Sequence, residues 1–386
     1  MKKLFFIALM VVFVVGITLS GIGCKADPEV IVETVTETVV ETVEVEKEAE
    51  PEEDFTPFYM TADFKSYVEL PFNTKVESGD IPDEMGVMPV DRVAPETLKF
   101  AFLGGATNPF FDIIKAGVDA SAEALAVHNV TIEWILPGVT LTSADYGEAI
   151  ATLQVQGFNA ISGFILNEGM IPYVNDAVDS GIVFACSIAD TQPNKSLFFT
   201  GQDLYNGGVT AAHAMAEMIG NEGKVAVITG YFNVVAHEER RLGFVDTIAA
   251  EYPNIEIVGE VENLDQADKA LTQTNDFMTA HPDLAGVYVT AGGPIGSGQA
   301  VEDAGKAGEI IVICFDPLPQ TIEYIKNGSI QAAIGQNPYA EGRDPLIRVF
   351  NYMMEGTLPD YHNLFTRADV VTIDTLDAFY ASGQQG

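Results

Sequence analysis

Two aromatic rings and an amide follow the first apolar strand of the sequence, in Asn108-Pro109-Phe110-Phe111. A strand-like run at 98–103 precedes them, and a helical spacing of apolar residues follows them. Asn108 suits a helix cap because its side-chain oxygen can accept a free backbone N–H, and Pro109 suits the first helical turn. Ligands of open α/β sheets bind outside the carboxyl ends of strands. The motif is therefore either a helix start with core rings or part of a ligand site.

No pattern in the sequence matches a common catalytic or metal-binding motif. The five histidines lack the HExxH spacing of a zinc site, and no GxSxG nucleophile elbow occurs. The glycine-rich run 292–298 lacks the lysine of a phosphate-binding loop and the spacing of a dinucleotide site. The sequence therefore favours a binding protein, without catalytic residues, bound metal or cofactor, over an enzyme.

The composition limits the partners of the chain. Its 386 residues are 47% hydrophobic, which is enough for two domains with cores of their own, and its formal net charge is −37. Such a surface repels phosphate backbones, so nucleic acid is not an expected partner. Cys186 and Cys314 lie in apolar strand-like runs, where small buried thiols are expected rather than a disulfide.

The first 95 residues read as three segments before the folded part. Residues 1–24 have a basic start, a sixteen-residue apolar run and small residues before Cys24, which indicates an export signal. As a helix that run would span about 24 Å, short of the roughly 30 Å of a bilayer core. Residues 25–56 form an acidic low-complexity stretch, which we expect to be a disordered tether. Residues 57–95 mix aromatics with Pro and Gly, and we expect an irregular extension lying on the domain.

From residue 97 onward, strand-like and helix-like segments alternate. Strands are expected at 98–103, 130–135, 160–165, 182–186, 197–200, 224–229, 255–261, 286–290, 310–315 and 330–334. Helices are expected near 109–126, 143–156, 170–180, 206–219, 237–251, 266–280, 297–304, 319–327 and 340–354. Continuous apolar strands between amphipathic helices predict parallel sheets covered on both faces. The expected fold is α/β, with two doubly wound parallel-sheet lobes dividing the strands.

The order of several motifs resembles the type I periplasmic solute-binding proteins of ABC sugar importers, the ribose- and galactose-binding group. The likeness covers about residues 96–380. Its markers are Asn108-Pro109-Phe110-Phe111, Thr200-Gly201-Gln202-Asp203, Glu239-Arg240-Arg241-Leu242-Gly243-Phe244, His281-Pro282-Asp283, Phe315-Asp316 and Ile334-Gly335-Gln336-Asn337. The first 24 residues also resemble a bacterial lipoprotein signal, which implies lipidation of Cys24, although Gly21 stands where Leu is usual.

The resemblance implies two lobes joined by a three-crossing hinge near residues 202, 336 and 370. It implies an N-terminal lobe of residues 96–201 plus 338–369 and a C-terminal lobe of residues 202–337 plus 370–386. Ligand would lie between them, with the rings of Phe110 and Phe111 stacking on a sugar and Asn108 reaching a hydroxyl. Asp316 would accept hydroxyl hydrogen bonds, and Gln336 would touch ligand from the hinge.

Other positions depart from the ribose-binding pattern. Asp190 is a ligand residue or a turn residue, where the ribose group has an Asp-Arg pair. The ligand-binding arginine of the family falls at Glu238 or at Arg240, and these two can also pair with each other on a helix surface. Ala291 stands at a strand end where ribose binders carry Asn. Two of the residues matched above also have an alternative role. Asp316 can be a helix cap instead of a ligand residue, and the Gln336 side chain can hydrogen-bond hinge backbone groups instead of the ligand.

We therefore expect an exported binding protein, in the periplasm or lipid-anchored on the outer face of the membrane. It would act as a monomer and deliver a small polar solute, most simply a sugar, to an ABC permease. Two alternatives remain open: a nucleoside or furanone-like signal as ligand, and a sensor module that presents solute to a receptor.

Overall fold

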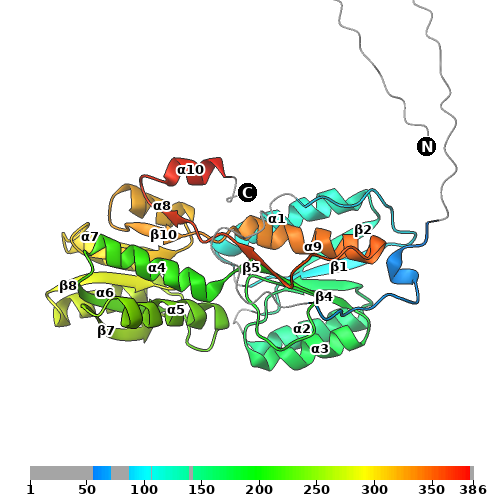
Figure 1. The fold of residues 1–386 in the computed structure, drawn as a ribbon, viewed down its shortest axis with the longest axis horizontal. Coiled ribbons are helices and arrows are strands. Elements are labelled where there is room, and N and C mark those ends of the chain that lie inside the picture. Colours follow the sequence, from blue (N-terminus) through cyan, green and yellow to red (C-terminus); the bar gives the residue numbers. More distant parts are fainter. Residues whose placement is uncertain (1–54, 71–86, 106, 139–141, 383–386) are drawn as a thin grey trace, which may run out of the picture. The chain divides into compact units, whose positions relative to one another are not determined.

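The computed structural model describes residues 55–70, 87–105, 107–138 and 142–382. Within these ranges the chain forms two six-stranded sheets, each covered by helices (Figure 1). Across the first sheet the order is β11 (Asn363–Thr366), β5 (Phe199–Gln202), β4 (Val183–Ser187), β3 (Ala160–Gly163), β1 (Leu98–Leu103) and β2 (Val130–Ile135). Across the second it is β12 (Val370–Val371), β10 (Ala332–Ile334), β9 (Ile311–Phe315), β8 (Leu284–Val289), β6 (Gly223–Thr229) and β7 (Ile255–Glu262).

Helices cover both faces of each sheet. The first sheet carries α1 (Pro109–Ala126), α2 (Ser143–Val155), α3 (Ile171–Asp179) and α9 (Pro338–Glu355), with the short helix η2 (Glu168–Met170) before α3. The second carries α4 (Leu204–Met218), α5 (Val235–Glu251), α6 (Ala267–Ala280), α7 (Pro294–Asp303) and α8 (Pro319–Lys326), and α10 (Leu376–Ala381) packs its apolar face near α8. Helices α1 and α9 lie together on one face of the first sheet, with α2 and α3 on the other (Figure 1).

The two sheets repeat one strand order, which confirms the prediction of two doubly wound lobes. The central strands β1, β3 and β4 pair in parallel, as do β6, β8 and β9, and β12 joins the second sheet antiparallel. Parallel strands covered on both faces must be apolar throughout, and five of the six residues of β1 are buried. In each sheet the order reverses beside the first strand, at β1/β3 and β6/β8, where a crevice opens in this type of sheet.

The chain passes between the sheets three times. It crosses after β5, between β10 and α9, and between β11 and β12. Gln202 and Gly335 bring two of these crossings together, because the Nε2 atom of Gln202 donates to the Gly335 carbonyl at 2.8 Å. The strand pairing establishes which strands belong to each sheet, whereas the residue boundaries expected for the lobes remain predictions.

The described parts of the 57–95 segment lie on the first lobe. The short helix η1 (Phe58–Met60) opens the segment, and the rings of Phe58 and Phe64 pack on Tyr352 of α9. The Tyr352 hydroxyl donates to the Lys65 carbonyl at 2.7 Å, and the backbone N–H of Val90 donates to Asn351 at 2.9 Å. The segment therefore covers the outer side of α9.

Most element predictions are confirmed, to within a few residues at each end. The elements that the sequence did not predict are β11, β12, α10 and the short helices η1 and η2, and each is two to six residues long. Such short segments show too few repeats of an apolar pattern to be recognised. Cys186 and Cys314 are buried free thiols, as expected. No described helix combines the length and the apolarity that crossing a bilayer would require.

Among the described residues, glycines let three helix pairs approach backbone to backbone, namely α1–α9, α4–α5 and, at Gly296 of α7 against Ala267 of α6, α6–α7. A Cβ at Gly117 of α1 would stand 2.1 Å from the Tyr339 carbonyl oxygen of α9, and one at Gly342 would stand 2.1 Å from that of Ile114. In the second lobe, a Cβ at Gly243 of α5 would stand 2.0 Å from the carbonyl oxygen of Tyr205 in α4. Real Cβ contacts do not occur at these distances, so each pair must separate if a side chain is added.

We predict that Gly117→Ala lowers the free energy of unfolding by about 2 kcal/mol, because an added methyl overpacks the α1–α9 contact. Helix propensity alone would give the opposite sign, a gain of about 0.5–1 kcal/mol. Denaturant unfolding followed by circular dichroism measures the change. Ala116→Ser, at the exposed neighbouring position, is the control and should change little. A Gly117→Ala protein as stable as the wild type would contradict the prediction.

Candidate functional site

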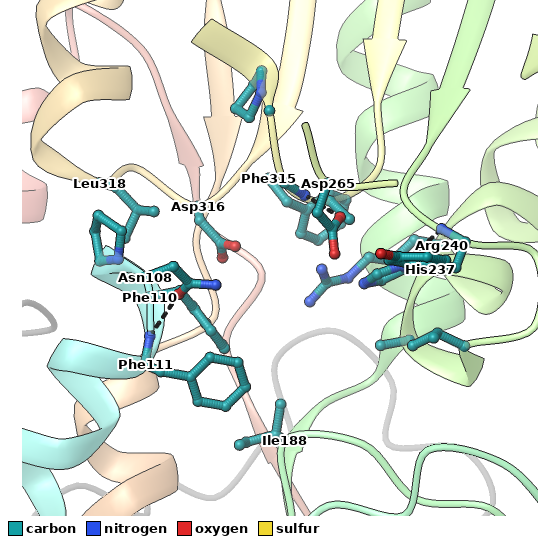
Figure 2. Close-up of a pocket in the computed structure, with 18 of the residues that line it drawn as sticks. Asn108, Phe110, Phe111, Ile188, His237, Arg240, Asp265, Phe315, Asp316 and Leu318 are labelled. Atoms are coloured by element: carbon teal, nitrogen blue, oxygen red, sulfur yellow. Dashed lines mark hydrogen bonds between the residues drawn. The ribbon is translucent and has the colours of Figure 1, made fainter. Parts of the chain in front are cut away.

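A cavity of about 710 Å³ opens at the carboxyl ends of strands of both sheets. The first lobe lines it with Thr107, Asn108, Pro109, Phe110, Phe111, Thr142, Phe164, Leu166, Ile188 and Ala189. The second lobe lines it chiefly with Tyr231, Asn233, His237, Arg240, Asp265, Ala291, Phe315, Asp316, Leu318 and Gln320, and Gln336 joins them from the crossing before α9. Figure 2 shows the labelled side chains of both groups around this space. The cavity therefore lies at the switch points of the two sheets.

The first wall is built by the start of α1. The Asn108 side chain caps the helix by accepting the Phe111 backbone N–H at 3.1 Å, and Pro109 occupies the first turn, as the sequence predicts. The rings of Phe110 and Phe111 meet edge to face, with their centroids 5.3 Å apart, and the Phe111 ring packs on the Phe164 ring with a centroid separation of 5.8 Å. Capping uses the Asn108 oxygen, so the amide NH₂ is the group that remains for a ligand.

The second wall carries a hydrogen-bonded chain of three side chains. Arg240 donates from Nη2 to the Gln336 amide oxygen at 2.7 Å, and Gln336 donates from Nε2 to Asp316 at 2.5 Å. The Arg240 guanidinium also lies 3.9 Å from the centroid of the Phe315 ring. Arg240 is only 4% exposed and Gln336 only 1%. These bonds fix both the amide orientation and the position of the Asp316 carboxylate.

Arg240 is the cation shared by the acids of the cavity. Burial raises the pKa of the Asp316 carboxyl, and the charge of Arg240 and the hydrogen bond from Gln336 act against that rise. Burial also raises the pKa of Asp265, against the Gly292 backbone N–H, which donates to it at 2.9 Å, and against Arg240. Without Arg240 both carboxyl groups would be much harder to ionise, so the guanidinium maintains two hydrogen-bond acceptors in the wall.

His237 contributes a neutral donor. The Tyr231 backbone N–H donates to His237 Nδ1 at 3.0 Å, so the proton of the neutral ring must lie on Nε2. Burial, together with the charge of Arg240, lowers the pKa of His237 to about 3. The ring therefore stays uncharged at neutral pH and offers one N–H.

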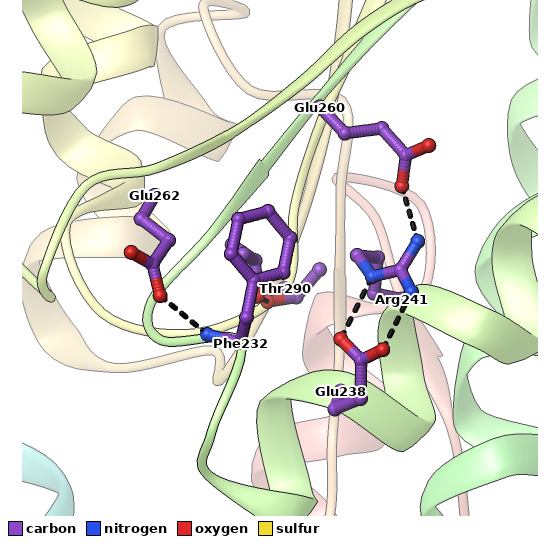
Figure 3. Close-up of polar contacts among 7 residues, drawn as sticks. Phe232, Glu238, Arg241, Glu260, Glu262 and Thr290 are labelled. Atoms are coloured by element: carbon purple, nitrogen blue, oxygen red, sulfur yellow. Dashed lines mark hydrogen bonds and ion pairs between the residues drawn. The ribbon is translucent and has the colours of Figure 1, made fainter.

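Two residues expected at the site do not line the cavity. Asp190 accepts hydrogen bonds from Asn194 at 2.7 Å and Gln192 at 2.5 Å, which hold its carboxylate within its own turn. Glu238 pairs with Arg241 at 2.6 Å, and Arg241 also pairs with Glu260 (Figure 3). The structure therefore places both carboxylates outside the cavity lining, in contrast to the other expected site residues. Helix positions two residues apart point about 200° apart, so Arg240 faces the cavity and Glu238 does not.

The other expected residues come together. Asn108, Phe110, Phe111, Arg240, Ala291, Asp316 and Gln336 all line the cavity. Sequence reasoning missed Asp265, His237, Ile188 and Phe164, which line it as well. Asp265 stands a few residues beyond a predicted strand, and that position was its only signal. Nothing in the sequence marks His237, because its role depends on a backbone bond to Tyr231.

Glu341, in the first turn of α9, is a further buried acid close to this network. It is fully buried, and neither carboxylate oxygen has a hydrogen bond of normal geometry among the described residues. Burial raises its pKa well above the usual range, which the charge of Arg240 partly offsets. The Ser187 hydroxyl holds the Glu341 backbone carbonyl at 2.5 Å, so the residue stays in place. The folded protein therefore retains a proton on Glu341 over a pH range where the unfolded chain has lost it.

We predict that the contribution of Glu341 to the free energy of unfolding falls as pH rises above about 4.3, the usual pKa of Glu, because the folded state keeps its proton there. His237, whose pKa is lowered, contributes a slope of opposite sign below about pH 6.5, so the effect of Glu341 is read from the difference between the wild type and Glu341→Gln. Glu341→Gln should flatten the fall with rising pH and make the protein more stable than the wild type at pH 8, by about 1–3 kcal/mol. Urea unfolding at pH 5 and pH 8 measures both quantities. The control is Glu123→Gln, which removes an exposed acid from α1. An unchanged slope in Glu341→Gln would refute the assignment.

Comparisons with known proteins agree with this geometry. A model of the periplasmic binding protein domain matches residues 101–353. The xylose/arabinose-binding protein XylF of Sulfolobus acidocaldarius is 24% identical over 331 residues, 81% of this chain and 80% of that protein. The ribose import binding protein RbsB of Salmonella typhimurium is 26% identical over 240 residues, 60% of this chain and 76% of that protein.

A solved structure shows the same likeness. The arabinose-binding protein AraP of Geobacillus stearothermophilus has a TM-score of 0.62 at 27% identity, over 74% of this chain and 99% of that one. The fold is that of type I periplasmic binding proteins, whose family consists of extracytoplasmic substrate-binding proteins and not of enzymes. With more than half of its length matched by the family model, this chain belongs to the periplasmic binding protein family.

Proposed function

We propose that this chain captures a monosaccharide in the cavity and delivers it to the permease of an ABC transporter. The observation that carries the proposal is the contrast between the cavity walls. Phe110 and Phe111 present rings from one lobe, and Arg240, Asp316 and Gln336 present a fixed polar network from the other. A sugar has apolar C–H faces and a rim of hydroxyl groups, so one molecule can satisfy both walls.

The energies are sufficient for tight binding. A hydrogen bond to a charged group contributes roughly 1.5–3 kcal/mol net, and micromolar affinity requires about 8 kcal/mol. Asp265 and Asp316 are two ionisable acceptors held in the wall, and Arg240 and His237 are donors. A few of these hydrogen bonds and one stacked ring therefore give a dissociation constant in the micromolar range, once the entropy lost on ordering the ligand and side chains is subtracted.

The relatives support the ligand class. XylF is named for xylose and arabinose, RbsB for ribose and AraP for arabinose. We infer delivery to a permease by analogy with RbsB, whose name states a role in import. Since one chain lines the whole cavity, we propose that it acts as a monomer.

We further propose that the mature protein is exported and anchored by a lipid on Cys24. Residues 1–54, which hold the signal, Cys24 and nearly all of the acidic tether, lie outside the described residues. The support is the sequence pattern: a basic start, an apolar run too short to span a bilayer, and small residues before the cysteine.

Asp316→Asn should weaken sugar binding by about 10- to 100-fold, the equivalent of one charge-assisted hydrogen bond. Asn is a suitable replacement because Asp316 has a φ of +66°, a conformation that Asn tolerates. Isothermal titration against pentoses and hexoses measures the affinities. Asp190→Asn is the matched control, because it makes the same change on a carboxylate outside the cavity, and it should leave affinity unchanged. Failure of the wild type to bind any monosaccharide would refute the function.

Cys24→Ser should move the protein from the membrane fraction to the soluble exported fraction and abolish incorporation of labelled palmitate. Fractionation of cells expressing the full chain makes the comparison. Cys186→Ser, which alters a buried thiol of the folded part, should leave membrane association intact. A Cys24→Ser protein that stays on the membrane and keeps the label would exclude lipidation at this residue.

A further inference from the structure

Ile188 has a backbone conformation that is rare for its residue type. It follows β4 directly and has a φ of +71°, in the left-handed region. Among the described residues with positive φ other than glycine, the remainder are Asn, Asp and Leu, so Ile188 is the β-branched member. A β-branched side chain in this region is a genuine outlier, and such strain costs about 1–3 kcal/mol.

Neighbouring groups hold this conformation in place. The Ala189 N–H donates to the Ser187 carbonyl at 2.8 Å, which closes a three-residue turn centred on Ile188, and the Ile188 N–H donates to the Thr200 carbonyl at 3.1 Å. The Ala189 carbonyl accepts from the Ile165 N–H at 2.9 Å. A three-residue turn with positive φ at its central residue is the rare, strained form of the γ-turn, in contrast to the common inverse γ-turn with negative φ. The surrounding strands therefore impose the backbone, and the side chain is left facing the cavity (Figure 2).

The strain places an apolar side chain in an apolar part of the wall. We define the apolar corner as the cavity residues that follow β3 and β4, namely Phe164, Leu166, Ile188 and Ala189. All four are buried, and the Ile165–Ala189 backbone bond joins the two loops that carry them. Within the described part of the chain, these loops contribute no polar side chain to the cavity lining. A ligand hydroxyl pointing into the corner would lose its water without gaining a side-chain partner from these loops.

The opposite wall has a different character. The titratable groups among the described lining residues all come from the second lobe, namely Tyr231, His237, Arg240, Asp265 and Asp316. A bound sugar can therefore direct its hydroxyl edge to that wall and must present another edge to the apolar corner. A buried hydroxyl without a hydrogen bond costs roughly 1–3 kcal/mol, whereas a methyl group in the same place is stabilised by burial.

We propose that Ile188 is a specificity-determining residue that selects deoxy sugars, in which a methyl group replaces the hydroxymethyl at the edge facing the apolar corner. The inference rests on the proposed function and deepens it by naming the substrate class. Asn or Asp would adopt this backbone conformation with less strain, but either would bring a hydrogen-bonding group into the corner. The strained Ile188 therefore keeps the corner apolar.

The test compares sugars that differ only at that group. The pairs are D-fucose with D-galactose and L-rhamnose with L-mannose, titrated calorimetrically against the purified wild type. The methyl member of at least one pair should bind about 10- to 100-fold more tightly, the range that a hydrophobic pocket gains per small group. Ile188→Val, which keeps a branched apolar side chain, should preserve the preference.

Two variants then change the corner. In Ile188→Asn the preference should fall to about threefold or less, because the hydroxyl gains a partner. Ile188→Gly adopts positive φ without strain and so keeps the turn if Asn disturbs folding, and it should lower the preference in the same way. Circular dichroism and thermal unfolding establish that each variant is folded.

The outcomes separate the two proposals. A wild type that binds no monosaccharide overturns the proposed function, and this inference with it. A wild type that binds monosaccharides but gives equal affinities within both pairs, or prefers the hydroxyl members, overturns this inference alone. A methyl preference that persists in folded Ile188→Asn and Ile188→Gly shows that another residue sets it and also overturns the inference.

Discussion

A single buried cation organises the polar wall of this protein. The Arg240 guanidinium is almost fully buried, packs on the Phe315 ring, and donates to Gln336, which in turn holds Asp316. Burying a charge is strongly unfavourable unless nearby charges and hydrogen bonds compensate for it. The carboxylates of Asp265 and Asp316 supply that compensation and are kept ionisable in return. Removing one member takes a hydrogen bond or a compensating charge from its neighbours, so the wall acts as one unit.

The sequence predicted the architecture because its parallel strands are continuously apolar and its helices amphipathic. It also predicted the start of α1, since Asn108 and Pro109 are local signals of a helix beginning. Short elements such as β11 and α10 escaped prediction, because their positions depend on the sheet or helix they join. Local pattern therefore determines which segments form, whereas packing determines the edges of the sheets.

The site was predictable only in part, for a similar reason. Asp316 and Gln336 stand at strand ends and matched a family motif, whereas Asp190 stands at a strand end but is held by its own turn. The spacing of residues in the sequence does not distinguish Asp316 from Asp190, because the difference between them lies in the direction that the backbone takes after each strand. Ile188 shows the same limit, since its positive φ results from bonds to neighbouring strands and could not be inferred from an apolar residue type.

The glycine contacts have a mechanical consequence. Helices α9 and α4 begin directly after two of the crossings between sheets, and each is held backbone to backbone against another helix of its own lobe through Gly342 or Gly208. Neither helix can tilt without breaking such a contact. These contacts stiffen the two helices against their own lobes, so a bend between the lobes would be concentrated in the few residues around positions 202, 336 and 368, where the chain changes lobes.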